Sequence, residues 1–324
     1  RRLEALGRAL APVCGADADN VATAAHISKS DLLTEMVMEF PELQGLMGRY
    51  YAAAEGYAAD IAAALDEQYQ PRGAGGALPQ TRTGLALAIA EKLDTLVGGF
   101  AIGAKPTGSK DPYALRRMAI SLIRLINENN LNLPLDRALA ASAATYPATL
   151  AADKHTAAVR DYIRERLDSY YREQGIRSET VQAVLALGGD DLVDNDRRIR
   201  ALDTFASSDS VKNLLASAKR IRNILKKNGE RDGAVQTALL QEPAEQALWQ
   251  AWQDKQPAFE QALAASDYRA ALEPLATLGA PLDAFFTDVM VMSDDPALQQ
   301  NRLTLLTTLQ RGFDKIADLS LLSE

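Results

Sequence analysis

Cysteine and histidine are nearly absent from this sequence. The single cysteine, Cys14, excludes a disulfide within the chain and any cysteine-rich zinc site. A serine–histidine–aspartate site or a histidine-rich metal site would have to use one of only two histidines, His26 and His155. A lone cysteine also fits a protein of the reducing cytoplasm, and cytoplasmic is the location that we expect.

Long apolar runs are missing as well. No uninterrupted apolar stretch approaches the roughly 20 residues that a membrane helix needs, so no membrane partner is expected. The opening Arg1-Arg2-Leu3 shows neither a methionine nor a signal-peptide pattern, and we expect a fragment of a longer protein. Positive charge is in the minority, with 35 lysines and arginines against 43 aspartates and glutamates. On charge alone nucleic acid is not the expected partner, so RNA binding would need a local basic surface.

Alanine and leucine dominate what is present, and β-branched runs are scarce. Hydrophobic residues make up 47% of the 324 residues and charged residues 24%, as in an ordinary globular protein with a buried core. The 13 prolines and 20 glycines fall mostly between stretches of helical periodicity. The sequence therefore predicts an all-α protein of about two domains, at roughly 150 residues per domain.

Helical periodicity and end signals locate the expected helices. Asn20 is the predicted N-cap of a first helix that runs to about Phe40, and Asp111 caps a later helix with Pro112 at its first position. The pair Gly188-Gly189 marks the best candidate boundary between domains. The expected helices cover about 20–40, 41–54, 57–69, 81–100, 111–129, 153–174, 178–187, 196–205, 209–227, 244–265, 267–278, 282–289 and 296–319.

The loop from Gly103 to Lys110 comes close to a phosphate-binding P-loop without matching it. That motif needs lysine directly before serine or threonine, so that lysine reaches the terminal phosphates and the hydroxyl reaches Mg²⁺. Here Ser109 precedes Lys110, and the loop follows a predicted helix rather than a strand. A structured loop before the next helix is the favoured interpretation, and no catalytic residue is predicted on this chain.

A few polar residues could gather into a small polar centre. His26 lies four residues before Ser30, so the two share a face of one predicted helix with Asp31 next to them. Glu91 and Asp94 lie together on another predicted helix. The more common role for such residues is a place on a helix surface or a satisfied position in the core, and this is the favoured interpretation.

The strongest basic stripe runs from Val211 to Lys227 and contains no acidic residue. At 100° per residue, leucine, isoleucine and alanine gather on one side of this predicted helix, and lysine and asparagine gather on the other. The stripe either binds RNA or is a solvated charged face. The candidate RNA-contacting residues are Lys212, Lys219, Arg220, Arg222, Asn223 and Lys226, with Asn301 and Arg302 in the last predicted helix as a second group.

Five sequence blocks together resemble the beta subunit of glycyl-tRNA synthetase of the bacterial two-subunit type. The blocks are long, lie in the order found in that family and span nearly the whole chain. They read SKSDLLTEMVMEFPELQGLMGRYYA (28–52), EQYQPRGAG (67–75), AEKLDTLVGGFAIGAKPTGSKDPYALRR (90–117), SAKRIRNIL (217–225) and FFTDVMVMSDDPALQQNRLTLL (285–306).

The resemblance implies a domain order and a set of partners. It implies an HD-like helical domain over residues 1–150, a helical linker over 151–194 and a helical-bundle anticodon-binding domain of the arginyl-type synthetase class over 195–324. The implied partners are tRNA(Gly) and the synthetase alpha subunit, in an α2β2 complex. The family's adenylation site lies in the alpha subunit with its ATP and Mg²⁺, so this part of a glycine–tRNA ligase is expected to bind tRNA without a cofactor of its own.

The sequence departs from the pattern of HD-type phosphohydrolases, which bind metal through a His-Asp pair. Ser30-Asp31 occupies that position here, and Glu91 stands where a later metal-binding aspartate is expected. Because a hydroxyl is a poor substitute for a neutral imidazole, no metal site is expected. A metal-dependent HD-type phosphohydrolase is the alternative hypothesis, and a purely structural helical scaffold is the third.

Overall fold

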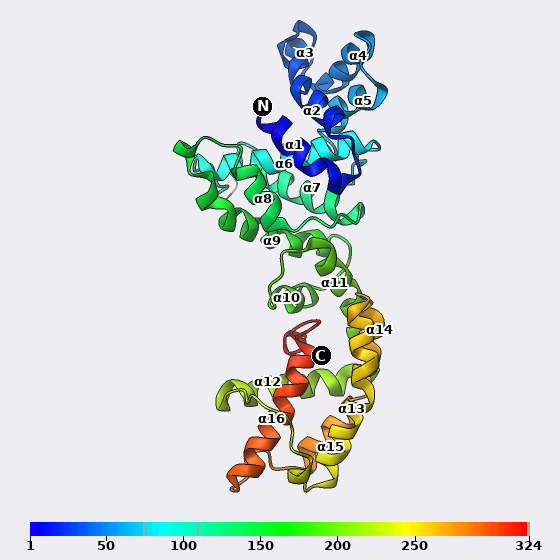
Figure 1. The fold of residues 1–324 in the computed structure, drawn as a ribbon, viewed down its shortest axis with the longest axis vertical. Coiled ribbons are helices and arrows are strands. Elements are labelled where there is room, and N and C mark those ends of the chain that lie inside the picture. Colours follow the sequence, from blue (N-terminus) through cyan, green and yellow to red (C-terminus); the bar gives the residue numbers. More distant parts are fainter. Residues whose placement is uncertain (74, 109, 323–324) are drawn as a thin grey trace. The chain divides into compact units, whose positions relative to one another are not determined.

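The protein is built from helices. A computed structural model describes residues 1–73, 75–108 and 110–322, and within these ranges it contains α-helices and short 3-10 helices but no strand (Figure 1). The predicted all-α class is confirmed. None of the helices in the described ranges is long and apolar enough to cross a membrane.

The chain forms two compact units. Unit 1 comprises Arg1–Tyr170 with Asp190–Val193, and unit 2 comprises Tyr171–Gly189 with Asp194–Glu324. Both changes of unit near residue 190 fall at the predicted boundary around Gly188-Gly189. The three-part division into 1–150, 151–194 and 195–324 stays a prediction.

Unit 1 is organised around α6 (Arg82–Ala101), which is buried on nearly every side. A helix that is apolar all round needs neighbours all round, and α1, α2, α5, α7 and α8 all pack against α6. The other helices of unit 1 are α1 (Arg2–Cys14), α2 (Ala18–Ile27), α3 (Glu35–Glu39), α4 (Leu46–Ala54), α5 (Ala59–Glu67), α7 (Leu115–Glu128), α8 (Leu135–Ala143) and most of α9 (Thr156–Arg172).

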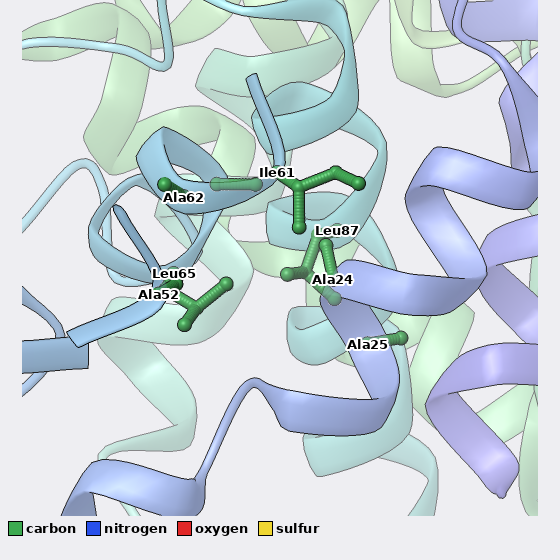
Figure 2. Packing of buried hydrophobic residues seen from close by; sticks show 8 residues of the cluster. Ala24, Ala25, Ala52, Ile61, Ala62, Leu65 and Leu87 are labelled. Atoms are coloured by element: carbon green, nitrogen blue, oxygen red, sulfur yellow. The ribbon is translucent and has the colours of Figure 1, made fainter. Parts of the chain in front are cut away.

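Small side chains let α2, α5 and α6 approach closely. Ala24 on α2, Ile61 on α5 and Leu87 on α6 lie together between the three helices, and Leu65 packs near Ala52 of α4 (Figure 2). Alanines at such crossings leave no room for larger residues, and close packing of this kind makes volume changes costly. This cluster fixes the position of α4 and of the short elements that precede it.

The helix predicted over residues 20–40 is wrong, because side chains compete with the backbone for hydrogen bonds. Asp17, not Asn20, caps the start of α2 by accepting from the backbone N–H of Asp19 at 3.0 Å. Beyond α2 the Ser28 hydroxyl donates to the Ala25 carbonyl at 2.9 Å, and the Thr34 hydroxyl donates to the Asp31 carbonyl at 2.7 Å. Such bonds favour turns over a continuous helix.

Three short elements replace the missing helical turns. They are η1 (Ser30–Leu33), α3 and η2 (Pro41–Leu43). The helix predicted over 41–54 is likewise interrupted, because Gly45 takes φ 82° and only residues C-terminal to it continue as α4. The remaining 3-10 turns of the described chain are η3 (Ala148–Leu150), η4 (Ala152–His155), η5 (Asp209–Val211), η6 (Thr237–Leu239) and η7 (Leu319–Leu321).

Unit 2 is a bundle in which α12 (Lys212–Asn228) packs against α15 (Gly279–Asp288), α16 (Pro296–Phe313) and η7. The bounds of α12 and α15 lie close to the helices predicted over 209–227 and 282–289, whereas α16 begins where predicted but ends at Phe313 and not at 319. The other helices of this unit are α10 (Ser178–Leu185), most of α11 (Leu192–Ala206), α13 (Pro243–Ala264) and α14 (Tyr268–Ala276).

A glycine allows α16 to lie against the buried Trp252 of α13. A Cβ atom at Gly312 would come within 2.5 Å of Cη2 of the Trp252 ring, and this ring is only 3% exposed. The ring also packs on Phe259 with 5.8 Å between the ring centroids. The close approach leaves the indole little room to move aside.

We therefore expect the Gly312→Ala substitution to destabilise unit 2 by about 1–3 kcal/mol, the usual effect of overpacking a core. Helix propensity alone would make the Gly312→Ala substitution stabilising, since alanine in a helix is favoured over glycine by roughly 1 kcal/mol. Urea unfolding followed by circular dichroism measures the difference. An unchanged or higher midpoint would show that Trp252 can move away freely.

Candidate functional site

The basic stripe forms one face of α12. Leu214, Leu215 and Ile221 are buried on the side that faces α15 and α16. The opposite face is exposed and carries a run of cations and one amide. Its residues are Lys212, Lys219, Arg220, Asn223, Lys226 and Lys227.

The two ends of α12 balance their positive charges in different ways. Lys226 and Lys227 lie in the last turn, where a helix favours positive charge, and Gly229 closes the helix by donating its N–H to the Leu225 carbonyl at 2.7 Å. At the other end Lys212 pairs with the exposed Asp209 at 2.8 Å. The hydrogen bond from Lys212 lowers the pKa of that carboxyl, so part of the positive charge at this end is already matched.

A hollow of about 610 Å³ lies along the exposed face of α12. Its rim is polar and basic, and its remaining lining is apolar. The lining residues are Ala216, Lys219, Arg220, Asn223, Ile224, Lys227, Asn228 and Met292. Within unit 2 this arrangement joins cations, amides and a partly exposed methionine in one concave surface, which can take a flat polar molecule together with an anion.

Arg220 has an internal support. Its guanidinium carbon lies 4.3 Å from the centroid of the Phe286 ring, which belongs to α15. The side chain of Arg220 nevertheless stays exposed. A guanidinium held over one aromatic ring can still offer its N–H groups to a second polar or charged group.

Arg222 points to a different task. Its side chain is half-buried and reaches Asp314 at 2.8 Å and Asp318 at 3.1 Å. Burial raises the pKa of the Asp314 carboxyl, although the hydrogen bond from Gln310 and the charge of Arg222 oppose this effect. Arg222 therefore links α12 to the end of α16, and its charge is largely matched within unit 2.

Asn301 and Arg302 are buried, at 4% and 5% exposure, and both hold neighbouring segments. Asn301 exchanges two hydrogen bonds with the backbone of Gln236, at 2.8 and 3.1 Å. Arg302 donates to both carboxylate oxygens of Glu245, at 2.9 and 3.2 Å, and to the Met290 carbonyl at 3.0 Å. Neither side chain lies on the exposed face of α12.

Glu245 is completely buried, and every contact that it makes stabilises its charged form. Besides Arg302, the backbone N–H groups of Gln241 and Glu242 donate to it at 2.6 and 2.8 Å. Burial by itself would raise the pKa of Glu245. The hydrogen bonds from Arg302 and from the two backbone groups outweigh this effect and leave the pKa below its ordinary value.

In unit 1 the residues that would have formed a metal site have other partners. Asp31 is buried, and its Oδ2 accepts from the N–H groups of Gly45 at 2.6 Å and Gly48 at 3.2 Å. Glu91 lies 3.7 Å from Lys29 and 3.5 Å from the buried Lys92. Over residues 1–73, 75–108 and 110–322 no group of three or more histidines, cysteines, aspartates or glutamates could hold a metal ion.

The other members of the suggested polar centre are also engaged separately. His26 Nδ1 lies 2.9 Å from a Glu4 carboxylate oxygen, and Asp94 accepts from Arg2 at 2.8 Å. Ser30 is exposed. His26, Ser30 and Asp94 nevertheless line one hollow of about 560 Å³ together with Arg2 and Lys29. Asp31 and Glu91 are not part of its lining, so the structure brings together three of the five suggested residues.

The loop before α7 is a structured turn. Thr107 and Lys110 exchange backbone hydrogen bonds at 2.9 and 3.1 Å, while Ser109 lies outside the described residues. Asp111 was expected to be the N-cap of a helix with Pro112 at its first position, but Ala114 is the N-cap and the helix begins at Leu115. The Asp111 carboxylate still accepts from the free N–H groups of Leu115 and Arg116, at 2.7 and 3.0 Å.

Some contributors to the hollow were missed in the sequence. Phe286 and Met292 belong to a segment whose apolar pattern is typical of a core, and Met292 is 42% exposed. Lys227 stood in the basic stripe but outside the candidate set. The stripe itself was the only available signal, because a contact between α12 and residues 286–292 depends on tertiary folding.

Two family models match the chain. Residues 1–186 match the model described as "Glycyl-tRNA synthetase beta subunit", and residues 214–319 match the "DALR anticodon binding domain". The second match contains most of α12 and all of α13–α16.

Curated relatives share the sequence over its whole length. The glycine–tRNA ligase beta subunit of Dichelobacter nodosus is 56% identical over 323 residues, which is 100% of this chain and 47% of that protein. The same subunit of Methylobacillus flagellatus is 48% identical over 93% of this chain and 42% of its own length, and that of a Janthinobacterium is 45% identical over 99% and 46%. The chain thus spans about half the length of the curated relatives that it matches.

The Glu245–Arg302 pair gives a pH-dependent expectation. Because the pKa of folded Glu245 is lowered, the pair stabilises the fold above the unfolded pKa of about 4.5, and this contribution is lost as pH falls through the folded pKa. Glu245→Gln should therefore unfold more easily at pH 7, by about 3–5 kcal/mol, since it leaves the Arg302 charge buried.

As pH falls below 4.5 toward the lower pKa of folded Glu245, the difference in unfolding free energy between wild type and Glu245→Gln should narrow, because unfolded wild type then binds a proton that the folded carboxylate does not. Glu260→Gln on the same helix is the control, because Glu260 is exposed and its pair with Lys315 is long, at 3.8 Å. This substitution should lower the free energy of unfolding by only about 0–1 kcal/mol. Urea unfolding between pH 3 and pH 7 measures both. A constant gap across this range would contradict the assignment.

Proposed function

Because the chain belongs to the glycyl-tRNA synthetase beta-subunit family, we propose that it is the tRNA-binding part of a glycine–tRNA ligase and supports aminoacylation of tRNA(Gly) with an alpha subunit. The observation that carries this proposal is the basic hollow on α12, in the region that matches an anticodon-binding domain. The proposed partners are therefore tRNA(Gly) and the alpha subunit, and the proposed location is the cytoplasm.

The chemistry of the hollow suits unpaired RNA. Lys219 and Lys227 on the rim can approach backbone phosphates, while Ile224 and Met292 offer an apolar surface to a base. Arg220, held on Phe286, can stack on a base or hydrogen-bond to its edge. Sequence-specific proteins usually read RNA where bases are unstacked, as in an anticodon loop.

The acidity of the rest of the chain supports a single RNA-binding face. With a net charge of −8, most of the surface repels phosphates, so affinity concentrates where the local charge is reversed. The proposed contacts are Lys219, Arg220, Asn223 and Lys226, extended by Lys227, with Lys212 at the margin. Arg222 would support this face from behind. Asn301 and Arg302 are left out because they hold the interior.

ATP and Mg²⁺ are proposed to act on the alpha subunit. The loop at 103–110 has neither the residue order nor the preceding strand that a P-loop needs. The chain's own contribution would be to bind and orient tRNA for a reaction carried out elsewhere in the complex.

The Lys219→Gln/Arg220→Gln variant should bind tRNA(Gly) more weakly, because two cations leave the hollow. For each lost phosphate contact the slope of log affinity against log salt should fall by about 0.7–0.9. The matched control is Lys255→Gln/Arg269→Gln, which removes one lysine and one arginine from exposed positions of the same unit. Filter binding over a salt series measures both variants. Equal affinities and slopes would show that the α12 face does not meet RNA.

The purified chain alone should form no glycyl-adenylate. The physical reason is that its one candidate nucleotide loop cannot place a lysine and a hydroxyl on phosphates and Mg²⁺ in the required order. ATP–pyrophosphate exchange with glycine measures this activity. Exchange above background, abolished by a substitution in this chain, would place adenylation here instead.

A further inference from the structure

A second surface, in unit 1, has the properties of a protein docking face. We propose that the face formed by η1, α3, η2 and α4 binds a protein partner that presents apolar side chains surrounded by basic ones. This inference rests on the proposed function in one respect: the alpha subunit of the ligase is taken as that partner.

The face exposes an unusual amount of apolar surface. Leu33, Met38 and Tyr50 are 80%, 66% and 61% exposed, and Leu32, Met36 and Phe40 are exposed beside them in the sequence. All six lie within a segment of 19 residues, from Leu32 to Tyr50. In Figure 1 its helices α3 and α4 project beyond α1 and α6 of the same unit. Both α3 and α4 contact η1, so these residues belong to one group of connected short elements. Exposed apolar residues gathered in this way indicate an interaction site, whereas scattered ones need no explanation.

The face is held in shape by buried contacts. Asp31 accepts backbone hydrogen bonds from Gly45 and Gly48 and so ties η1 to the start of α4. Ala52 of α4 packs in the core cluster with Leu65 of α5 (Figure 2). The exposed side chains therefore stand on a formed scaffold, and a partner would not have to order this segment on binding.

The charge of the face selects the class of partner. Glu35, Glu39, Glu42 and Glu55 are all exposed, and Arg49 is the only basic residue between positions 30 and 60. At its Leu33 end the face adjoins a hollow lined by Arg1, Arg2 and Lys29. Over α3, η2 and α4 the carboxylates repel the phosphates of RNA and of anionic lipid surfaces. A protein surface with apolar residues and a rim of lysine or arginine fits both features.

A hollow of about 320 Å³ at this face can take one anchoring side chain. Its lining includes the aromatic rings of Tyr51 and Tyr57 and the carboxylates of Asp31 and Glu55. Within the described chain, Oδ1 of the buried Asp31 has no hydrogen-bond partner. Aromatic rings and carboxylates together favour an ammonium or guanidinium group, so the anchor is a lysine or arginine of the partner.

The test compares two matched double variants in binding to purified alpha subunit by isothermal titration calorimetry. Leu33→Ser/Tyr50→Ser removes two strongly exposed residues of the face. Ile102→Ser/Tyr113→Ser removes an equivalent pair, 57% and 52% exposed, elsewhere in unit 1. The first should weaken binding by about tenfold or more and the second should not. Glu55→Gln should also weaken binding and reduce its salt dependence, against the exposed control Glu173→Gln.

Binding of tRNA(Gly) is measured on the same samples. Lost binding to the alpha subunit with unchanged tRNA binding supports the docking face. Equal binding of the alpha subunit by both double variants overturns it, whatever happens to tRNA. Self-association in sedimentation velocity that only Leu33→Ser/Tyr50→Ser abolishes also overturns it, because the face would then meet a second copy. The tRNA binding of the Lys219→Gln/Arg220→Gln variant does not depend on these outcomes. It tests the proposed function and not the docking face.

Discussion

The buried ion pair between Glu245 and Arg302 is the contact on which the rest of unit 2 depends. It joins the start of α13 to α16, and its third arm reaches the Met290 carbonyl. Asn301, next along α16, holds the backbone of Gln236 in the same way. Two adjacent residues of one helix thus hold Gln236 and Glu245, which are distant in sequence, and also Met290, which is near. The segment with Met290 leads to Met292 at the hollow on α12. The interior polar contacts and the candidate RNA-binding face are parts of one arrangement.

Positive charge in this chain is divided between structure and surface. Arg222 and Arg302 have carboxylate partners inside unit 2, whereas Lys219 and Lys226 extend from α12. The same division holds in unit 1, where the buried Lys92 donates to the Gln68 carbonyl and burial lowers its pKa. The number of basic residues in the sequence does not tell structural from surface roles. For most of these residues the role follows from whether the side chain lies on the buried or on the exposed side of its helix.

The sequence predicted what depends on local patterns. The apolar and basic sides of α12 follow from a period of 3.6 residues, and the family resemblance rested on long blocks in order. The helix predicted over 20–40 is wrong because Ser28 and Thr34 make local hydrogen bonds to the backbone. The periodic pattern of apolar residues gives no sign of these bonds. Arg302 was expected to contact RNA, but it is buried in an ion pair. Its partner Glu245 lies 57 residues away, so the sequence near Arg302 does not indicate an internal role.

The contact between Arg220 and Phe286 has a consequence for the entropy cost of binding at the α12 face. A free arginine side chain loses up to about 2 kcal/mol of rotamer entropy when it is immobilised. In this chain part of that loss occurs during folding, when the guanidinium settles on the ring at 4.3 Å. If this face binds RNA as proposed, a base would meet a guanidinium already held against a ring, so less of the entropy loss would fall on binding and more of it on folding.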